Sequence, residues 1–264
     1  MREIHATFRG GQVWLGYFLY KLSGTVVRSG CALTGVYGKG KPFTPFLPVP
    51  IETDITHAAG ITKLFSLISA HYPKVLPEAE LPNYYRLAEN HNLGELENGD
   101  IPSDGTRDSK KINALEREWV ISIIEATYPP KIAKSVIQFY DEFEAKSTPR
   151  GRFFYMLGDK LDGILSPLFF EKLGVEPDIY EKVNTHGKDP KKLVDIMSTK
   201  FTGTNLVADN FLYSEFYDPK FFKYPFLDVF LEIIQSAALS VRGKEMEWLN
   251  RELNRRISGY YDTT

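Results

Sequence analysis

Apolar residues recur along most of the chain at the three- and four-residue intervals of an amphipathic α-helix. No stretch alternates apolar and polar residues for long enough to predict a β-sheet. A first helix is expected at about 12–22, where Val13, Tyr17 and Tyr20 lie close to helical spacing. Residues 23–50 are rich in Gly, Pro and Thr and predict a long loop. The pattern therefore indicates an all-α fold, a helical bundle.

The next two expected helices each carry a histidine on an apolar face. A helix that begins near Asp54 places His57 in phase with the apolar residues that follow it. The following helix is expected to begin at Pro82, to carry His91 on its apolar stripe, and to continue as far as Gly99. The two imidazoles are therefore expected to point into the bundle.

The rest of the chain predicts more helices, and one domain over residues 1–264. A chain of this length can bury a full hydrophobic core. The segment 174–225 is mixed in pattern and is interpreted as an irregular embellishment, whereas residues 51–173 form the core of the motifs. The further helices are expected at 110–128, 132–145, 149–173 and 227–257.

Charge narrows the choice of partner. The formal net charge is −2 and the isoelectric point is about 6.2, so there is no overall basic field to hold polymeric nucleic acid. The net charge does not exclude a local basic pocket for a small phosphate compound. A small-molecule ligand is therefore favoured over a nucleic-acid polymer.

Cysteine content and the apolar runs bear on the compartment. The single cysteine, Cys31, excludes an internal disulfide and is typical of a reduced, cytoplasmic chain. The apolar run Val13–Tyr20 is too short for a membrane span and lacks a cleavage site, so no membrane association is expected. The aromatic cluster Phe211–Phe226 is interpreted as core or as the interface of a homodimer.

The two inward histidines are the first candidates for chemistry. A lone inward histidine is most often a core residue with a satisfied hydrogen bond. Two of them on adjacent helices, His57 and His91, with oxygen donors close in sequence, instead indicate a site for a divalent transition metal.

Three acidic residues extend this candidate site. Glu95 follows His91 at the i+4 position, which would place both on one helix face, and Asp100 follows soon after. Either residue alone is typical of a solvated helix end, but the two together favour general acid–base catalysis. Asp159 lies in an otherwise apolar helix, where it needs a partner. That partner is either a metal ion or the neighbouring Lys160.

Three blocks of sequence resemble the HD-domain metal-dependent phosphohydrolases, and among them the subgroup of bacterial 5′-deoxynucleotidases. The resemblance covers roughly 51–170, and spacing within each block agrees as well as residue type. The blocks are ITHAAG around His57, HNLGELENGDIP from His91, and DEFEAKSTPRGRFFYMLGDKLD from Asp141.

The resemblance implies roles for individual residues. It implies that Glu95 positions or activates the attacking water, and that Asp100 contacts substrate or assists proton transfer. The implied metal is a divalent ion, Mn, Co, Zn, Fe, Ni or Mg, which polarises a phosphoryl oxygen and activates water. Its implied ligands are His57, His91, Asn92 and Asp159.

The implied substrate is a nucleotide, most simply a deoxynucleoside 5′-monophosphate. A nucleoside triphosphate hydrolase of the same fold is one alternative. The other is a catalytically weakened regulatory protein that binds a nucleotide or a metal.

Two departures from the family pattern stand out. Relatives often have Glu-His-Ser at the first histidine, whereas this chain has Thr56-His57-Ala58, so we expect His57 to lack a supporting carboxylate. Asn92 replaces the aspartate that names the family. An amide oxygen can coordinate a metal, but it lacks the charge that attracts a dication. An engineered variant, a natural enzyme with a weakened site, and a pseudoenzyme all remain open.

Several cations are candidates for phosphate binding, and each is otherwise a solvated surface charge. The family often places a phosphate-binding arginine where Arg28 lies, and Lys110 and Lys111 begin the helix after GDIPSDG. Arg152 is expected to pair with Glu142 or Glu144. The candidates are Arg28, Lys110, Lys111, Arg150 and Arg152.

Overall fold

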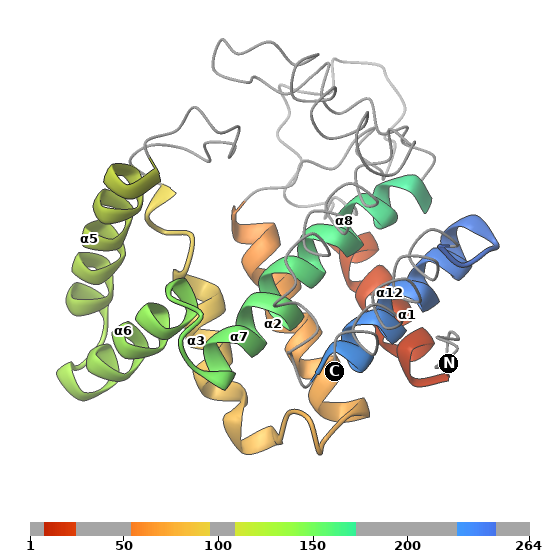
Figure 1. Ribbon diagram of the computed structural model, residues 1–264, viewed down its shortest axis with the longest axis horizontal. Helices are drawn as coiled ribbons and strands as arrows, with labels where there is room; N and C mark the ends of the chain where they lie inside the picture. The colour runs from red at the N-terminus through yellow and green to blue at the C-terminus, as the bar shows by residue number, and fades with distance from the viewer. Residues whose placement is uncertain (1–7, 25–53, 96–108, 173–225, 247–264) are drawn as a thin grey trace, which may run out of the picture.

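The computed structural model describes residues 8–24, 54–95, 109–172 and 226–246. All regular elements within these ranges are helical, which confirms the all-α prediction (Figure 1). The helices are α1 (Phe8–Gly24), α2 (Asp54–His71), the short η1 (Glu78–Glu80), α3 (Leu81–Asn90), α5 (Ser109–Thr127), α6 (Pro130–Glu144), α7 (Pro149–Phe154), the π-helical turn η2 (Tyr155–Lys160), α8 (Leu161–Lys172) and α12 (Leu227–Arg242).

Helix α2 lies at the centre of the bundle. It packs against α3 on one side and α1 on the other, and α7, η2 and α8 run past it as one continuous helical stretch (Figure 1). Helix α12 packs against both α1 and α8, while α5 packs against α6 at the edge of the bundle (Figure 1). This arrangement brings α2, the end of α3 and η2 together.

An aromatic core fixes these helices against one another. The ring of Phe65 on α2 lies 4.9 Å from that of Tyr84 on α3 and 5.5 Å from that of Phe154 on α7. Tyr84 also meets Phe139 of α6 edge-on at 5.1 Å. Tilted and edge-on pairs of this kind add to the stabilisation that comes from burial of apolar surface. The aromatic residues therefore hold the helices that carry the candidate site.

The prediction that the helix beginning at Pro82 reaches Gly99 is wrong. Helix α3 ends at Asn90, whose side chain donates to the Tyr128 hydroxyl at the end of α5. The chain then turns, and a side chain at Gly94 would meet the backbone of Glu116 at 2.7 Å. Packing against α5 therefore ends the helix where local sequence would have continued it.

Other helix boundaries follow the sequence more closely. Helices α1, α2, α5 and α6 and the stretch from α7 to α8 lie where helical spacing predicts them. Helix α12 begins as expected but ends at Arg242, not at 257, because Gly243 adopts a left-handed conformation with φ of 68°. The predicted loop at 23–50 and the embellishment at 174–225 lie outside the described residues. Among the described helices, none combines the length and apolar character needed to cross a bilayer.

Candidate metal centre

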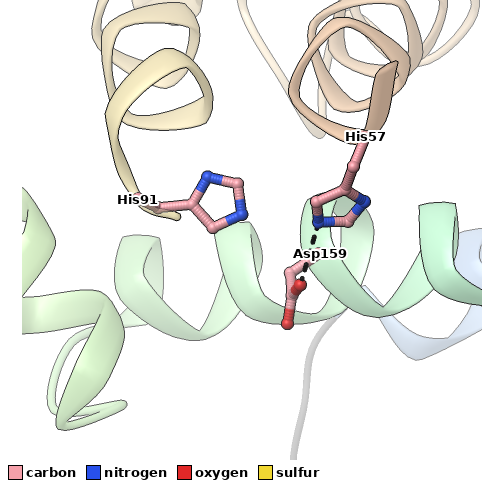
Figure 2. Close-up of side chains that lie close together, drawn as sticks. All are labelled: His57, His91 and Asp159. Atoms are coloured by element: carbon pink, nitrogen blue, oxygen red, sulfur yellow. Dashed lines mark ion pairs between the residues drawn. The ribbon is translucent and has the colours of Figure 1, made fainter. Parts of the chain in front are cut away.

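Three potential metal ligands meet between α2, α3 and η2. His57 comes from the first turns of α2, His91 from the residue after α3, and Asp159 from the π-helical turn (Figure 2). One ligand atom from each lies within 4.8 Å of the others, and the two imidazole centroids are 5.4 Å apart. The predicted convergence of His57, His91 and Asp159 is therefore present. π-helical turns are frequent at functional sites, and here one carries the carboxylate.

The His91 ring presents an unused lone pair to this cluster. Its Nδ1 lies 2.9 Å from the carbonyl oxygen of Ala88, to which it donates, so Nε2 is the deprotonated nitrogen. Burial, reinforced by the positive charge of His57, lowers the pKa of His91 to about 4. His91 is only 5% exposed, and among the described residues Nε2 is a buried atom with no hydrogen-bond partner. Buried polar atoms rarely lack a partner, so this nitrogen calls for a ligand.

The His57 ring lies between two carboxylates. Its Nε2 is 3.4 Å from Oδ1 of Asp159, and its Nδ1 is 2.7 Å from Oδ2 of Asp162. Burial disfavours the charged ring, but the hydrogen bonds to the two carboxylates outweigh it and raise the pKa of His57 to about 10. In the metal-free protein, His57 is therefore an imidazolium.

Asp159 is ionised although it is partly buried. Burial favours the neutral acid, but the positive charges of Lys160 and His57 outweigh it and hold the pKa of Asp159 well below its usual range. The Nζ atom of Lys160 lies 3.8 Å from Oδ2. Asp159 thus faces the two histidines and also has the neighbouring lysine as an ion-pair partner.

Asp162 was missed by sequence reasoning. It is fully buried, and it accepts a hydrogen bond of 2.7 Å from the hydroxyl of Tyr17 as well as contacting His57. The expectation that His57 lacks a supporting carboxylate is therefore wrong, because Asp162 supplies it from α8. The spacing of Asp159 and Asp162 in DKLD, three residues apart on one helix face, was the signal available in the sequence.

Asn92 and Glu95 follow His91 along the chain. Asn92 lines a groove of about 420 Å³ between α2 and α3, and its role as a ligand stays a prediction. Glu95 is not on α3, because the turn after Asn90 intervenes, so the expectation that it shares a helix face with His91 is wrong. Its backbone N–H bonds to the carbonyl of Asn92 at 3.0 Å, which ties it to the end of that turn.

The candidate substrate-binding residues are placed only in part. Arg28 and Asp100 lie outside the described residues, and Lys110 and Lys111 lie in the first turn of α5. The side chains of these two lysines lie outside the part of the protein that the structure describes.

Two further candidate phosphate-binding arginines, Arg150 and Arg152, have partners within the protein. Arg150 forms a two-pronged ion pair with Glu142, with Nη2 2.7 Å from Oε1. Arg152 donates to the carbonyl of Lys146 at 3.2 Å. The expectation that Arg152 pairs with Glu142 or Glu144 is therefore wrong: among the described residues Arg152 donates to a carbonyl, and Arg150 pairs with Glu142.

The donor set fits a divalent transition metal. Two imidazole nitrogens and a carboxylate oxygen, held on helices or on the residue directly after one, are ligands that such ions accept. The unpartnered Nε2 of His91 supports the fit, because it lacks any other role among the described residues.

A family model of the HD domain matches residues 63–198, just over half of the chain. The chain belongs to the HD-domain family. HD-domain proteins are in general hydrolases that use a divalent metal to cleave phosphoesters, and the cluster could hold such an ion. His91 and Asp159 lie within the matched segment and His57 just before it. No curated protein and no solved structure matches the chain.

Proposed function

We propose that this HD-domain protein removes phosphate from a nucleotide, most simply a deoxynucleoside 5′-monophosphate, with the help of a divalent metal. The observation that carries the proposal is the buried, unpartnered Nε2 of His91, which faces His57 and Asp159. A neutral imidazole nitrogen with a free lone pair is a common metal ligand.

The chain's own residues then divide the work. His57, His91 and Asp159 hold the ion, and the amide oxygen of Asn92 is the proposed fourth ligand. When bound, a divalent ion supplies Lewis acidity toward a phosphoryl oxygen and lowers the pKa of water. Glu95, which lies three residues after Asn92, orients the attacking water. Asp100 is assigned to proton transfer or to contact with the substrate. The residues assigned to phosphate binding are Arg28, Lys110 and Lys111.

The groove between α2 and α3 supports a small substrate. It is bordered by Ala58, which follows His57, and by Asn92, which follows His91. Its volume of about 420 Å³ lies within the range of small-molecule sites. Thr62, Lys63 and Ser66 give it polar walls.

Metal content and phosphate release together test the proposal. The purified protein would be analysed for bound metals, loaded with Mn²⁺ or Co²⁺, and assayed against deoxynucleoside and nucleoside mono- and triphosphates. Orthophosphate from monophosphates supports the proposal, whereas inorganic triphosphate or pyrophosphate from triphosphates supports the alternative substrate class. A failure to hydrolyse any of these nucleotides would contradict the proposal.

Two histidine variants provide a matched comparison. His91→Ala should lose both metal and turnover, because it removes the proposed ligand. His71→Ala makes the same change at the far end of α2, outside the cluster, and should keep both.

Asn92 favours a second candidate function, that of a nucleotide- or metal-binding regulatory protein. The neutral amide weakens attraction for a dication at the position where the family pattern has a carboxylate. Saturable nucleotide binding without release of phosphate, with every metal tested, would select this function.

A further inference from the structure

We infer that Asp162 and Tyr17 position the His57 ring for metal binding, so that α1 is part of the metal centre although it lies outside the matched HD-domain segment. The inference rests on the proposed metal site. Tyr17 is 145 residues from Asp162 in sequence, and its hydroxyl lies 2.7 Å from Oδ1 of that carboxylate.

The two oxygens of Asp162 have different partners. Oδ2 lies 2.7 Å from Nδ1 of His57, and Oδ1 accepts the hydrogen bond from Tyr17. Asp162 and Tyr17 are both fully buried, so water does not compete for these bonds. The carboxylate therefore has one orientation in which both bonds form.

The surroundings of the pair leave little room for movement. A methyl group at Gly60 of α2 would lie 2.1 Å from Oδ1 of Asp162, so this carboxylate is seated directly against the helix backbone. The hydroxyl of Tyr17 also lies 3.3 Å from Oγ of Ser166, one turn along α8. Contacts with α2, α1 and α8 thus hold Asp162 in place.

This fixed carboxylate selects one orientation of the His57 ring. The last torsion of a histidine side chain is broad and roughly two-fold, so packing alone selects poorly between the two flips. The bond to Asp162 keeps the proton-bearing Nδ1 on the α8 side, and Nε2 then faces Asp159 and His91. Loss of a carboxylate that holds a metal-binding histidine in this way typically weakens metal affinity by about ten- to a hundredfold.

A second tyrosine–carboxylate pair in the same protein serves as the control. The hydroxyl of Tyr72 donates to Oε1 of Glu232 at 2.6 Å, and the same oxygen accepts the backbone N–H of Gly10. This pair joins the residue after α2 to α12, and within the described part of the chain the polar partners of His57 are Asp159 and Asp162 instead. Equivalent substitutions at the two pairs therefore separate positioning of His57 from general stability.

The experiment measures Co²⁺ binding to the full chain by calorimetry and the imidazole resonances of the metal-free protein by ¹⁵N NMR. Asp162→Asn should weaken Co²⁺ binding about tenfold, and Tyr17→Phe should weaken it by a smaller factor. Both should shift the ring-nitrogen resonances of His57. Glu232→Gln and Tyr72→Phe should change neither readout.

Unchanged Co²⁺ affinity in Asp162→Asn would overturn the inference, as would equal losses in the control variants. If Asp162→Asn does not fold, Tyr17→Phe decides between these outcomes. If Co²⁺ binding depends on Asp162 but the protein hydrolyses no nucleotide, the proposed function is overturned and this inference stands. Hydrolysis with affinity independent of Asp162 would overturn this inference alone, and absence of Co²⁺ binding to the unaltered chain would overturn both.

Discussion

The Nε2 atom of His57 and Oδ1 of Asp159 lie 3.4 Å apart, across the contact between α2 and the π-helical turn η2. In the metal-free protein this contact joins an imidazolium to a carboxylate, because the pKa of His57 is raised to about 10. A metal ion bound at Nε2 must take the place of that proton. Metal binding and proton release are therefore linked at this pair.

We expect metal affinity to rise by about tenfold per pH unit between roughly pH 6 and 8, because each bound ion releases one proton from His57. The sign follows from the raised pKa: below about 10 the ring is protonated, and raising the pH removes the competing proton. Co²⁺ titrations in buffers of different ionisation enthalpy would measure both the affinity and the protons released. An affinity that does not change with pH would contradict the assignment of His57 as a ligand.

Asn92→Asp should bind Mn²⁺ or Co²⁺ more tightly and release phosphate faster. Adding one negative charge beside a dication, less the desolvation that accompanies it, gives an expected gain of roughly 1–3 kcal/mol, or about ten- to a hundredfold in affinity. Calorimetric titration and phosphate release on both proteins would measure the effect. Asn113→Asp on α5 provides the same chemical change outside the cluster. Equal affinities and rates would show that position 92 is not a ligand.

Glu95→Ala should abolish turnover and leave metal content nearly intact, because Glu95 is assigned to water and not to the ion. Glu95 is not a member of the group of three potential ligands that lie within 4.8 Å of one another. Metal analysis and phosphate release from the same preparation would test this, with Glu118→Ala on α5 as the control. Loss of metal in Glu95→Ala would make Glu95 a ligand.

Gly60→Ala should destabilise the protein by roughly 1–3 kcal/mol, because the added methyl group overlaps a buried carboxylate. The new carbon would lie 2.1 Å from Oδ1 of Asp162. Gly163→Ala is the matched control, since a methyl group there meets nothing within 4 Å. That change should stabilise α8 by about 0.5–1 kcal/mol. Urea unfolding of both variants would distinguish the two outcomes, and a neutral Gly60→Ala would show that Asp162 is free to move.

Arg150→Ala should reduce stability by about 1 kcal/mol without changing KM for a nucleotide, because Arg150 is occupied by Glu142. The hydrogen bond from Arg150 is the main cause that lowers the pKa of Glu142 to about 2. The stability from this pair is therefore present above the ordinary pKa of 4.5 and is lost as the pH falls toward 2. Unfolding curves at several acidic pH values should show a smaller loss in the variant. A large rise in KM would instead place Arg150 on the phosphate.

Helical periodicity was sufficient to predict the class of fold and the helices that carry the site. The inward phase of His57 and His91 is a local property, since residues three and four apart on a helix share a face whatever packs against them. Asp159 stood out for a similar reason, as a carboxylate in an apolar helix. These features, with the spacing inside the three blocks, were enough to predict a histidine–aspartate metal site in an HD-domain protein.

Contacts between distant segments decided the remainder. Helix α3 ends at Asn90 because Glu116 of α5 and Tyr128, the residue after α5, meet the chain there, and no residue within the helix signals that encounter. Asp162 became the partner of His57, 105 residues away, and of Tyr17, 145 residues away. Such pairs depend on how helices cross, which the periodicity of each helix leaves undetermined. The sequence by itself determined which faces are buried, and only tertiary packing decided which buried polar groups meet.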